Sequence, residues 1–219
     1  MSENSVRIYG HMLSQPTRVV VAFCIMNNIP YEFHEINTFN GDNRTPEFTR
    51  INPVQKIPAI VHGDFNLAES SAIAIYLAET FNAGGNMWPS DRQQRALVNQ
   101  YLHWHHNNTR KVGDYIFYKF FMPKFMGKTA PPEKEEEVKN FMEKTLHFIN
   151  EILASGKYVA RTSYPTLADI VCYCELAQFK LLAFDWSKYP GIMNWMQEIS
   201  KLSGVSESHE ALIKFAESQ

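Results

Sequence analysis

The residues from Asn52 to Phe81 read NPVQKIPAIVHGDFNLAESSAIAIYLAETF. Two short apolar runs flank a Gly63-Asp64 turn, a pattern that predicts two strands joined by a hairpin. Ile57-Pro58 precedes the first run. A proline at the start of a strand removes a backbone donor and is a candidate for a cis peptide bond. We therefore expect an extended edge with free backbone groups beside Ile57.

The sequence Glu69-Ser70-Ser71 follows the hairpin and opens an apolar helical pattern, which we expect to run from about Ser70 to Phe81. The first N–H groups of a helix lack partners within it, and with the helix dipole they favour a bound anion. An extended edge followed by such a helix start could hold a small peptide that carries a carboxylate. An ordinary helix cap is the alternative interpretation of Glu69-Ser70.

The residues before this stretch complete a small α/β pattern. VRIY at residues 6–9 predicts a strand, apolar residues from Thr17 recur at helical spacing after Pro16, and residues 31–36 alternate as a strand does. Residues 46–50 are expected to form a short helical turn. The order β-α-β, loop, β-β-α predicts an α/β layer fold with a mixed sheet.

The second half of the chain predicts helices only. Residues 83–91, AGGNMWPSD, break the pattern and are expected to link a domain at 1–82 to one at 92–219. The acidic run at 133–137 favours the first turns of an exposed helix. Thr166-Leu167-Ala168-Asp169 matches a capping box and opens a segment, residues 170–184, that is apolar nearly all round and predicts a buried helix.

Composition narrows the function classes. The 219 residues are 45% hydrophobic and 20% charged, which is typical of a soluble globular protein. A formal net charge of -2 gives no reason to expect nucleic acid or an acidic membrane surface as a partner. MSENSVRIYG lacks the pattern of a secretory signal, and no run is long enough to span a bilayer, so we expect a cytoplasmic protein.

The cysteines and histidines do not predict a metal centre. The three cysteines, Cys24, Cys172 and Cys174, are expected to be reduced, packed thiols. His103, His105 and His106 lie close in sequence, but only the first and last share a helix face, and no Glu or Cys completes a tetrahedral set.

Together these features resemble the cytosolic glutathione S-transferase family. The resemblance covers essentially the whole chain and rests on the order and spacing of four segments: residues 14–16 after the first strand, 52–60, 69–73 and 166–169. Leu13-Ser14-Gln15-Pro16, with Trp88-Pro89 and Trp104…Arg110, looks most like the theta class. The resemblance implies a thioredoxin-like α/β N-terminal domain, an all-α C-terminal domain and a homodimer.

The implied chemistry is attack of the glutathione thiolate, with glutathione as co-substrate, on an electrophile. A free thiol has a pKa near 8.5, so only a few per cent is thiolate at neutral pH. Ser14 stands at the start of the first helix, where its hydroxyl can donate a hydrogen bond to the sulfur and the dipole favours negative charge. From spacing alone, Ser14 is more simply a helix cap.

The resemblance also assigns residues to the tripeptide. The Ile57 backbone would pair with the cysteinyl unit beside a cis Pro58. Lys56 or Gln55 would meet the glycyl carboxylate. Glu69 would bind the γ-glutamyl ammonium, and Ser70 would bind the γ-glutamyl carboxylate.

One loop position departs from the family pattern. Theta-class relatives often place a histidine in the loop that contacts the glycyl end. That position looks like Asn43 here, and Arg44 follows it. Asn43 can still donate a hydrogen bond, and Arg44 can supply the lost charge.

On the helical side, Arg110 lies six residues after Trp104, at the position that theta-like enzymes use near the sulfur or the electrophile. An exposed helix arginine is the plainer interpretation. Tyr115, Phe117 and Phe121 are candidates for an apolar electrophile pocket. Aromatic residues at helical spacing are, however, more often core.

Three functions follow. The leading one is a glutathione transferase that conjugates or dehalogenates small hydrophobic or halogenated electrophiles. The alternative is a non-catalytic glutathione-binding, ligand-binding or regulatory protein on the same fold. A glutathione-dependent oxidoreductase would need a cysteine where Ser14 stands.

Overall fold

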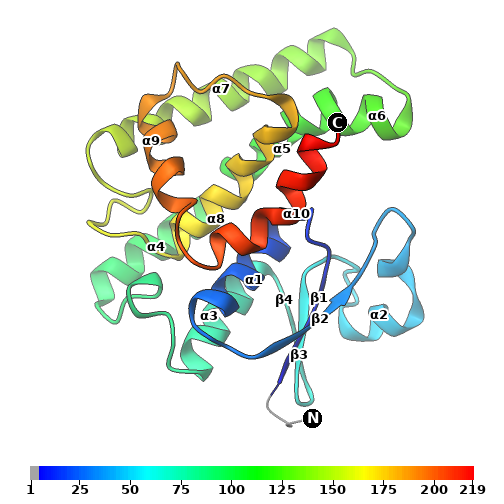
Figure 1. Ribbon diagram of the computed structural model, residues 1–219, viewed down its shortest axis with the longest axis vertical. Coiled ribbons are helices and arrows are strands. Elements are labelled where there is room, and N and C mark those ends of the chain that lie inside the picture. Colours follow the sequence, from blue (N-terminus) through cyan, green and yellow to red (C-terminus); the bar gives the residue numbers. More distant parts are fainter. Residues whose placement is uncertain (1–4) are drawn as a thin grey trace. The chain divides into compact units, whose positions relative to one another are not determined.

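The computed structural model describes residues 5–219 (Figure 1). Contacts within it divide the chain into two compact units. The first unit runs through Trp88 and also includes Leu202–Leu212. The second unit comprises Pro89–Lys201 and Ile213–Gln219.

The first unit contains a four-stranded sheet in the order β2-β1-β3-β4. β1 pairs in parallel with β2 and antiparallel with β3, and β3 pairs antiparallel with β4. The predicted mixed sheet and the hairpin across Gly63-Asp64 are thereby confirmed. The strands are β1 (Val6–Gly10), β2 (Tyr31–Glu35), β3 (Ala59–His62) and β4 (Phe65–Ala68).

Three α-helices accompany the sheet: α1 (Gln15–Met26), α2 (Pro46–Ile51) and α3 (Ser70–Thr80). α1 and α3 pack together on one face of the sheet, whereas α2 lies on the other side (Figure 1). Alternating side chains of β1 and the apolar stripes of α1 and α3 supply the core. This core includes the fully buried side chains of Ile8, Val20, Phe23, Ile60, Ile73 and Leu77.

Two glycines allow close approaches around α1. A Cβ at Gly10 would lie 2.5 Å from the Thr17 Cγ2 atom, so β1 meets α1 without space for a side chain. Gly204 has φ +78, and a Cβ there would lie 2.6 Å from the Ala22 carbonyl oxygen. Glycine at these positions brings the backbone of β1 and of the 202–212 segment directly onto α1.

The beginning of the predicted linker is anchored within the first unit. The Gly84 N–H donates a 2.7 Å hydrogen bond to Oδ1 of Asn27, at the end of α1. The Trp88 ring is 7% exposed, and its Nε1 donates to Glu79 Oε1 at 3.3 Å. A short 3-10 turn, Gly85–Met87, lies between these anchors.

The second unit is helical, as predicted. Its helices are α4 (Arg92–His105), α5 (Thr109–Ile116), α6 (Met122–Met126), α7 (Pro132–Ala154), α8 (Leu167–Leu176) and α9 (Pro190–Ile199), and α10 (Val205–Glu217) ends in it. A π-helical turn, Phe117–Phe121, joins α5 to α6. The acidic run at 133–137 begins α7, which agrees with the prediction. α7 packs against α5 and α9, and α8 packs against α4 and α5.

α8 is buried along its whole length and starts with the predicted capping box. The Thr166 N–H donates to Asp169 Oδ2 at 2.8 Å. The predicted extent of this helix is wrong, because α8 ends at Leu176 and a 3-10 helix, Ala177–Leu182, replaces its expected continuation to residue 184. Ala183 then adopts φ +46, a left-handed conformation that turns the chain out of the helix.

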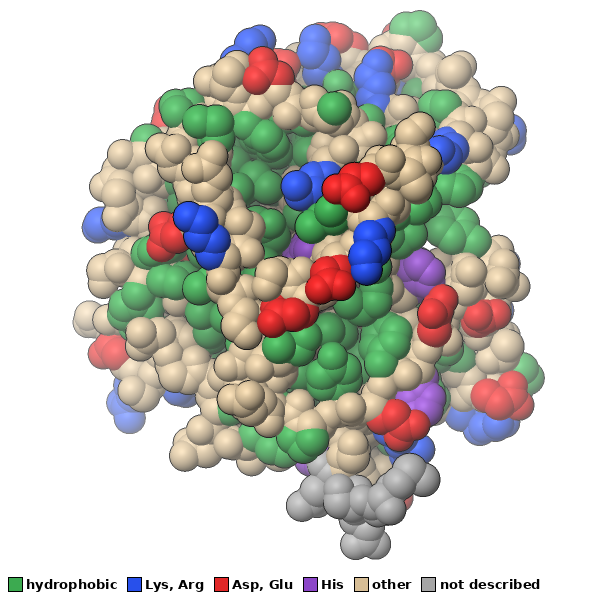
Figure 2. Space-filling view, in the orientation of Figure 1, with side chains coloured by type: hydrophobic (Ala, Val, Ile, Leu, Met, Phe, Trp, Pro, Cys, Tyr) green, Lys and Arg blue, Asp and Glu red, His purple; other side chains and the backbone are tan. Residues whose placement is uncertain are grey.

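The surface carries both signs of charge. On the face drawn in Figure 2, basic and acidic side chains are interspersed. None of the helices in residues 5–219 combines the length and apolar character required to cross a bilayer. Cys24, Cys172 and Cys174 are buried and form no disulfide, and burial raises the pKa of Cys24 to about 12.

Candidate active site

Ser14 lies immediately before α1, at the end of the loop that follows β1. Its N–H donates to the His11 carbonyl at 2.8 Å, and its own carbonyl accepts from the Arg18 N–H at 3.1 Å. The Ser14 side chain forms no capping hydrogen bond. The first turn of α1 therefore does not use the hydroxyl, which is half-buried and can donate to a ligand.

A buried guanidinium supports the loop that carries Ser14. Arg18 is fully buried one turn into α1, and its Nη1 donates to the Met12 carbonyl at 3.0 Å. This contact holds the loop and places a positive charge near the start of the helix, which favours an anion there. Arg18 was not predicted from the sequence. It could have been recognised as an arginine among the apolar residues of a helix whose other side chains are mostly buried.

The loop before β3 is organised by Asn52, which is 4% exposed. Its Nδ2 donates to the Lys56 carbonyl at 2.7 Å, and its Oδ1 accepts from the Val54 N–H at 3.1 Å. The Gln55 N–H donates to the Asn52 carbonyl at 2.9 Å. One amide side chain thus fixes the path of the backbone up to Lys56.

Asn43 and Gln55 meet in this loop. Asn43 Nδ2 donates to the Gln55 carbonyl at 2.8 Å, and Gln55 Nε2 donates to Thr49 Oγ1 at 3.1 Å. Gln55 has φ +57, a left-handed conformation that these bonds stabilise. Both amide side chains stabilise the loop through these hydrogen bonds, whereas the side chains of Arg44 and Lys56 are exposed.

The Ile57-Pro58 peptide bond is cis, as the sequence suggested. Pro58 is buried, and β3 begins at the next residue, Ala59, which pairs with Tyr9 of β1. Within residues 5–219, the Ile57 backbone makes no hydrogen bond to other backbone groups. This edge is therefore open to an extended peptide.

Glu69 and Ser70 form the start of α3. Glu69 adopts φ 69 and ψ 108, and its side chain forms no capping hydrogen bond. A non-glycine residue in a sparsely populated conformation costs on the order of 1–3 kcal/mol, and such residues cluster at functional sites. The Glu69 side chain is exposed, and Ser70 heads the first turn with N–H groups that have no partner within the helix.

Arg110 lies in the first turn of α5 and pairs with a buried carboxylate. Its Nη1 lies 3.2 Å from both Oε1 and Oε2 of Glu175 in α8. Glu175 Oε1 also lies 3.1 Å from Nε2 of His105, the last residue of α4. Burial raises the pKa of Glu175, but the Arg110 charge and the His105 hydrogen bond outweigh it and lower that pKa overall. Glu175 was not predicted from the sequence, although a charged residue inside the apolar 170–184 segment requires a partner.

The three predicted pocket residues do not gather in one place. Tyr115 stacks near Phe179 at 6.4 Å between ring centroids, and it also lines a polar depression beside the Lys119–Glu135 ion pair. Phe117 is 43% exposed. Phe121 packs among the neighbouring rings of the π-helical turn and α6.

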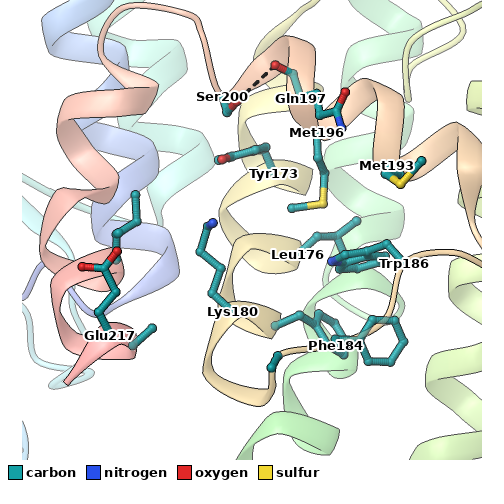
Figure 3. Close-up of a pocket in the computed structure, with 14 residues that line it drawn as sticks. Tyr173, Leu176, Lys180, Phe184, Trp186, Met193, Met196, Gln197, Ser200 and Glu217 are labelled. Atoms are coloured by element: carbon teal, nitrogen blue, oxygen red, sulfur yellow. Dashed lines mark hydrogen bonds between the residues drawn. The ribbon is translucent and has the colours of Figure 1, made fainter. Parts of the chain in front are cut away.

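A different cavity, of about 540 Å³, lies in the second unit between α8, α9 and the end of α10. Leu176, Trp186 and Phe184 lie on one side of it and Glu217 on the other (Figure 3). The rings of Phe184 and Trp186 are 4.8 Å apart. Neither Tyr115, Phe117 nor Phe121 lines this cavity.

The histidines near the end of α4 do not form a metal-binding group. Within residues 5–219, no cluster of three or more His, Cys, Asp or Glu side chains is arranged to hold a metal ion. His105 points into the second unit and contacts Glu175, whereas His103 and His106 are exposed.

Comparison with known proteins places these features in one family. Residues 4–79 match the family model for the glutathione S-transferase N-terminal domain, and residues 110–202 match that for the C-terminal domain. Glutathione S-transferase T1 of Arabidopsis thaliana is 31% identical, over 97% of this chain and 91% of the relative.

Solved structures agree over nearly the whole chain. The apo form of human glutathione S-transferase T1-1 has a TM-score of 0.90 and 28% identity, over 97% of this chain and 91% of that one. A human theta-class enzyme in complex with the glutathione conjugate of 1-menaphthyl sulfate has a TM-score of 0.89 and 30% identity. The match covers 97% of this chain and 89% of that one. The chain therefore belongs to the glutathione S-transferase family, in its theta class.

Proposed function

We propose that this protein is a serine-type glutathione transferase in which the Ser14 hydroxyl donates a hydrogen bond to the glutathione thiolate. The observation that carries the proposal is the Ser14 side chain at the start of α1, which forms no capping bond. The helix dipole and the buried Arg18 charge favour an anion at this end of α1. The thiol proton leaves to solvent, because a serine hydroxyl is too weak a base to take it.

The tripeptide is proposed to bind along the first unit. The open Ile57 edge beside cis Pro58 pairs with the cysteinyl unit, and Glu69 and Ser70 take the γ-glutamyl ammonium and carboxylate. Lys56 and Arg44 are exposed cations for the glycyl carboxylate, while Asn43 and Gln55 brace the loop. The human relative that holds a glutathione conjugate supports glutathione as the ligand.

The reaction is proposed to be nucleophilic substitution on a small hydrophobic or halogenated electrophile. The sulfur forms a bond to carbon, and the leaving group departs with the electron pair of the bond that breaks. Arg110 is proposed to bind the electron-rich leaving group, because a guanidinium stabilises negative charge that develops in the transition state. The candidates for contacts with the apolar part of the electrophile are still Tyr115, Phe117 and Phe121.

The remaining expectations come from the family resemblance and from the composition of the chain. We propose a homodimer that acts in the cytoplasm, with glutathione as co-substrate, no bound metal, and neither nucleic acid nor membrane as a partner. The domains are proposed to comprise residues 1–82 and 92–219, joined by residues 83–91.

The test is turnover of a small alkyl halide with glutathione by the intact protein, Ser14→Ala and Ser14→Thr. Loss of a hydrogen bond to a charged group costs about 1.5–3 kcal/mol, so Ser14→Ala should lower kcat roughly 10- to 100-fold. The Michaelis constant for glutathione should change little, because residues away from Ser14 bind the ends of the tripeptide. Ser14→Thr keeps a hydroxyl and should retain more activity than Ser14→Ala.

Two results would contradict the proposal. An unchanged kcat in Ser14→Ala would remove Ser14 from the mechanism. Tight glutathione binding without turnover, across alkyl halides, aryl halides, an aralkyl sulfate and a hydroperoxide, would instead favour the non-catalytic binding protein.

A further inference from the structure

We propose that Glu175 is a positioning residue for Arg110 and that His105 holds Glu175 in place, so that Arg110 presents its outer N–H groups to the electrophile. This inference rests on the proposed transferase function, because it gives Arg110 a leaving group to bind. Nothing in the sequence pattern joins these three residues. Their connection appears only when α4, α5 and α8 are packed together.

The three side chains link the ends of two helices to a buried third helix. His105 ends α4, and Arg110 lies in the first turn of α5. Glu175 is 65 residues further along, in α8, where every residue is buried. One carboxylate therefore fixes the junction between α4 and α5 relative to the buried helix.

The burial of Glu175 explains why its orientation is fixed. The residue is 4% exposed, and a buried carboxylate is tolerated only when it is paired and hydrogen-bonded. Oε1 contacts both His105 and Arg110, and Oε2 contacts Arg110. Rotation of the carboxylate would leave buried charge unpaired, so it is a rigid anchor.

His105 completes the anchor from the other side. Its side chain is 7% exposed, and Nε2 must carry the proton that the 3.1 Å contact with Glu175 requires. Nδ1 is buried and has no hydrogen-bond partner within residues 5–219. The rings of Tyr101 and His106 pack beside the imidazole, with centroids 6.3 Å and 5.3 Å away. The polar contact of His105 is thus directed at Glu175.

Arg110 is anchored at one end and open at the other. Only Nη1 reaches the carboxylate, and within residues 5–219 the Nε and Nη2 groups donate no hydrogen bond. The side chain is 43% exposed, so this outer edge reaches solvent. A guanidinium held in this way presents a planar pair of donors without first losing rotamer freedom.

Loss of Glu175 is expected to affect the reaction with only one of the two substrates, the electrophile. If Glu175 acts through Arg110, its loss should weaken the reaction with the electrophile and leave glutathione binding intact. A purely structural role would instead lower the stability of the second unit without separating the two substrates.

The kinetic test compares Glu175→Gln, Arg110→Ala and the double variant in alkyl halide turnover. We expect Glu175→Gln to lower kcat/KM for the halide about 10-fold, because loss of a charge-assisted hydrogen bond typically has an effect of this size. The KM for glutathione should stay within about twofold of its value in the intact protein. The double variant should be no less active than Arg110→Ala, because Glu175 has nothing to position once the guanidinium is absent. Additive losses in the double variant would overturn the proposal.

Three further variants guard against misfolding. His105→Gln keeps a donor opposite Glu175 and should retain more of the halide kcat/KM than His105→Ala. Tyr101→Phe removes a buried 3.1 Å hydrogen bond to Thr109 at the same helix junction without touching Arg110. It should leave both substrate constants unchanged. If Tyr101→Phe lowered kcat/KM for the halide as much as Glu175→Gln does, the junction between α4 and α5, and not the position of Arg110, would be responsible for the loss.

A direct measurement does not depend on catalysis. In ¹⁵N-arginine NMR spectra, an anchored guanidinium rotates slowly about its Cζ–N bonds, so Arg110 should give resolved Nη signals in the intact protein and averaged ones in Glu175→Gln. Identical Arg110 signals in both proteins would overturn the positioning claim. If the intact protein turned over no halide, the proposed function would fail while this spectrum still decided the claim about Arg110.

Discussion

Asn52 shows how a single amide side chain can shape the loop before β3, which is proposed to bind glutathione. It donates to the Lys56 carbonyl and accepts from the Val54 N–H while it is 4% exposed. The loop leads directly to the open Ile57 edge, so the position of that edge depends on Asn52. No charged side-chain group takes part in these bonds.

We predict that Asn52→Ala weakens both folding and glutathione binding. Leaving buried backbone groups unsatisfied costs about 1–3 kcal/mol, which denaturant titration measures as a lower free energy of unfolding. Calorimetry should show a weaker affinity for glutathione in the same variant. Asn66→Ala removes an exposed 3.3 Å bond to the Arg50 carbonyl and should change the free energy of unfolding by less than about 0.5 kcal/mol. Equal effects of the two variants would contradict this role of Asn52.

At this scale the sequence predicted some candidate site residues and missed others for a physical reason. The cis Ile57-Pro58 bond could be predicted because local chain geometry limits what a proline does at the start of a strand, whereas Ser14 was assigned from the family resemblance. The bond from Asn43 to the Gln55 carbonyl depends on how a loop folds back over 12 residues. The Glu175–Arg110 pair depends on helix packing, which no local pattern encodes.

Among the elements, the contact between β1 and α1 sets the place of Ser14. Gly10 ends β1 and Thr17 lies in the first turn of α1, on either side of the loop that carries Ser14. The Thr17 side chain fills the space where a Gly10 Cβ would stand.

We predict that Gly10→Ala lowers the free energy of unfolding by about 1–3 kcal/mol, because overpacking forces the strand and helix apart. Gly10→Ala combined with Thr17→Ala should recover most of the loss, since the nearest remaining Thr17 atom, Cβ, would be 3.2 Å from the new methyl group. Thermal and denaturant unfolding of the four proteins in this cycle measure the coupling. Additive losses would show that the two residues do not compete for space.

Asp169 ties the start of α8 to its neighbours. Its Oδ1 accepts from Trp195 Nε1 at 3.0 Å and from the Val159 N–H at 3.1 Å, and Oδ2 belongs to the capping box. Burial raises the pKa of Asp169 to about 6, and these hydrogen bonds only partly offset it.

A raised pKa means that the folded protein binds the proton more tightly than the unfolded chain does. The stability contributed by Asp169 is therefore fully present below about pH 4 and is lost as the pH rises through 6. Measured against Asp169→Asn, the free energy of unfolding should fall by about 3 kcal/mol across this window, the equivalent of two pKa units. Denaturant titrations at pH 4, 5, 6 and 7 would show it. A difference between the two proteins that stays constant or rises with pH would contradict the prediction.

Hydrophobic periodicity predicted the helices and strands well, because burial of one face fixes both the type of element and its register. It failed where the backbone changes helix type. The segment after Leu176 is also largely buried, yet it continues as a 3-10 helix and turns at Ala183. Alanine gives no sequence signal for the left-handed conformation found there.

For the whole molecule, the order of elements and the Thr166–Asp169 capping box were enough to predict both architectures. The strand and helix patterns and the capping box each contribute to the fold, so their agreement supports one architecture for each half of the chain. The cavity between α8, α9 and α10 could not be predicted in the same way. The 540 Å³ cavity is lined from α8, α9 and α10, and its shape depends on how those helices pack.

We predict a homodimer, as the family resemblance implies. Sedimentation at micromolar concentration should give the mass of two chains and show no appreciable monomer. Dilution to nanomolar concentration would then measure the dissociation constant. A single species with the mass of one chain at micromolar concentration would contradict this expectation.

The central claim is that Ser14 stabilises the thiolate, and the thiol pKa of bound glutathione tests it most directly. Ultraviolet difference titration follows thiolate formation in the complex with the intact protein and with Ser14→Ala. We predict a pKa for the bound thiol at least one unit below the value near 8.5 of a free cysteine thiol, and a rise of about one to two units in Ser14→Ala. The same thiol pKa in both complexes would contradict the claim.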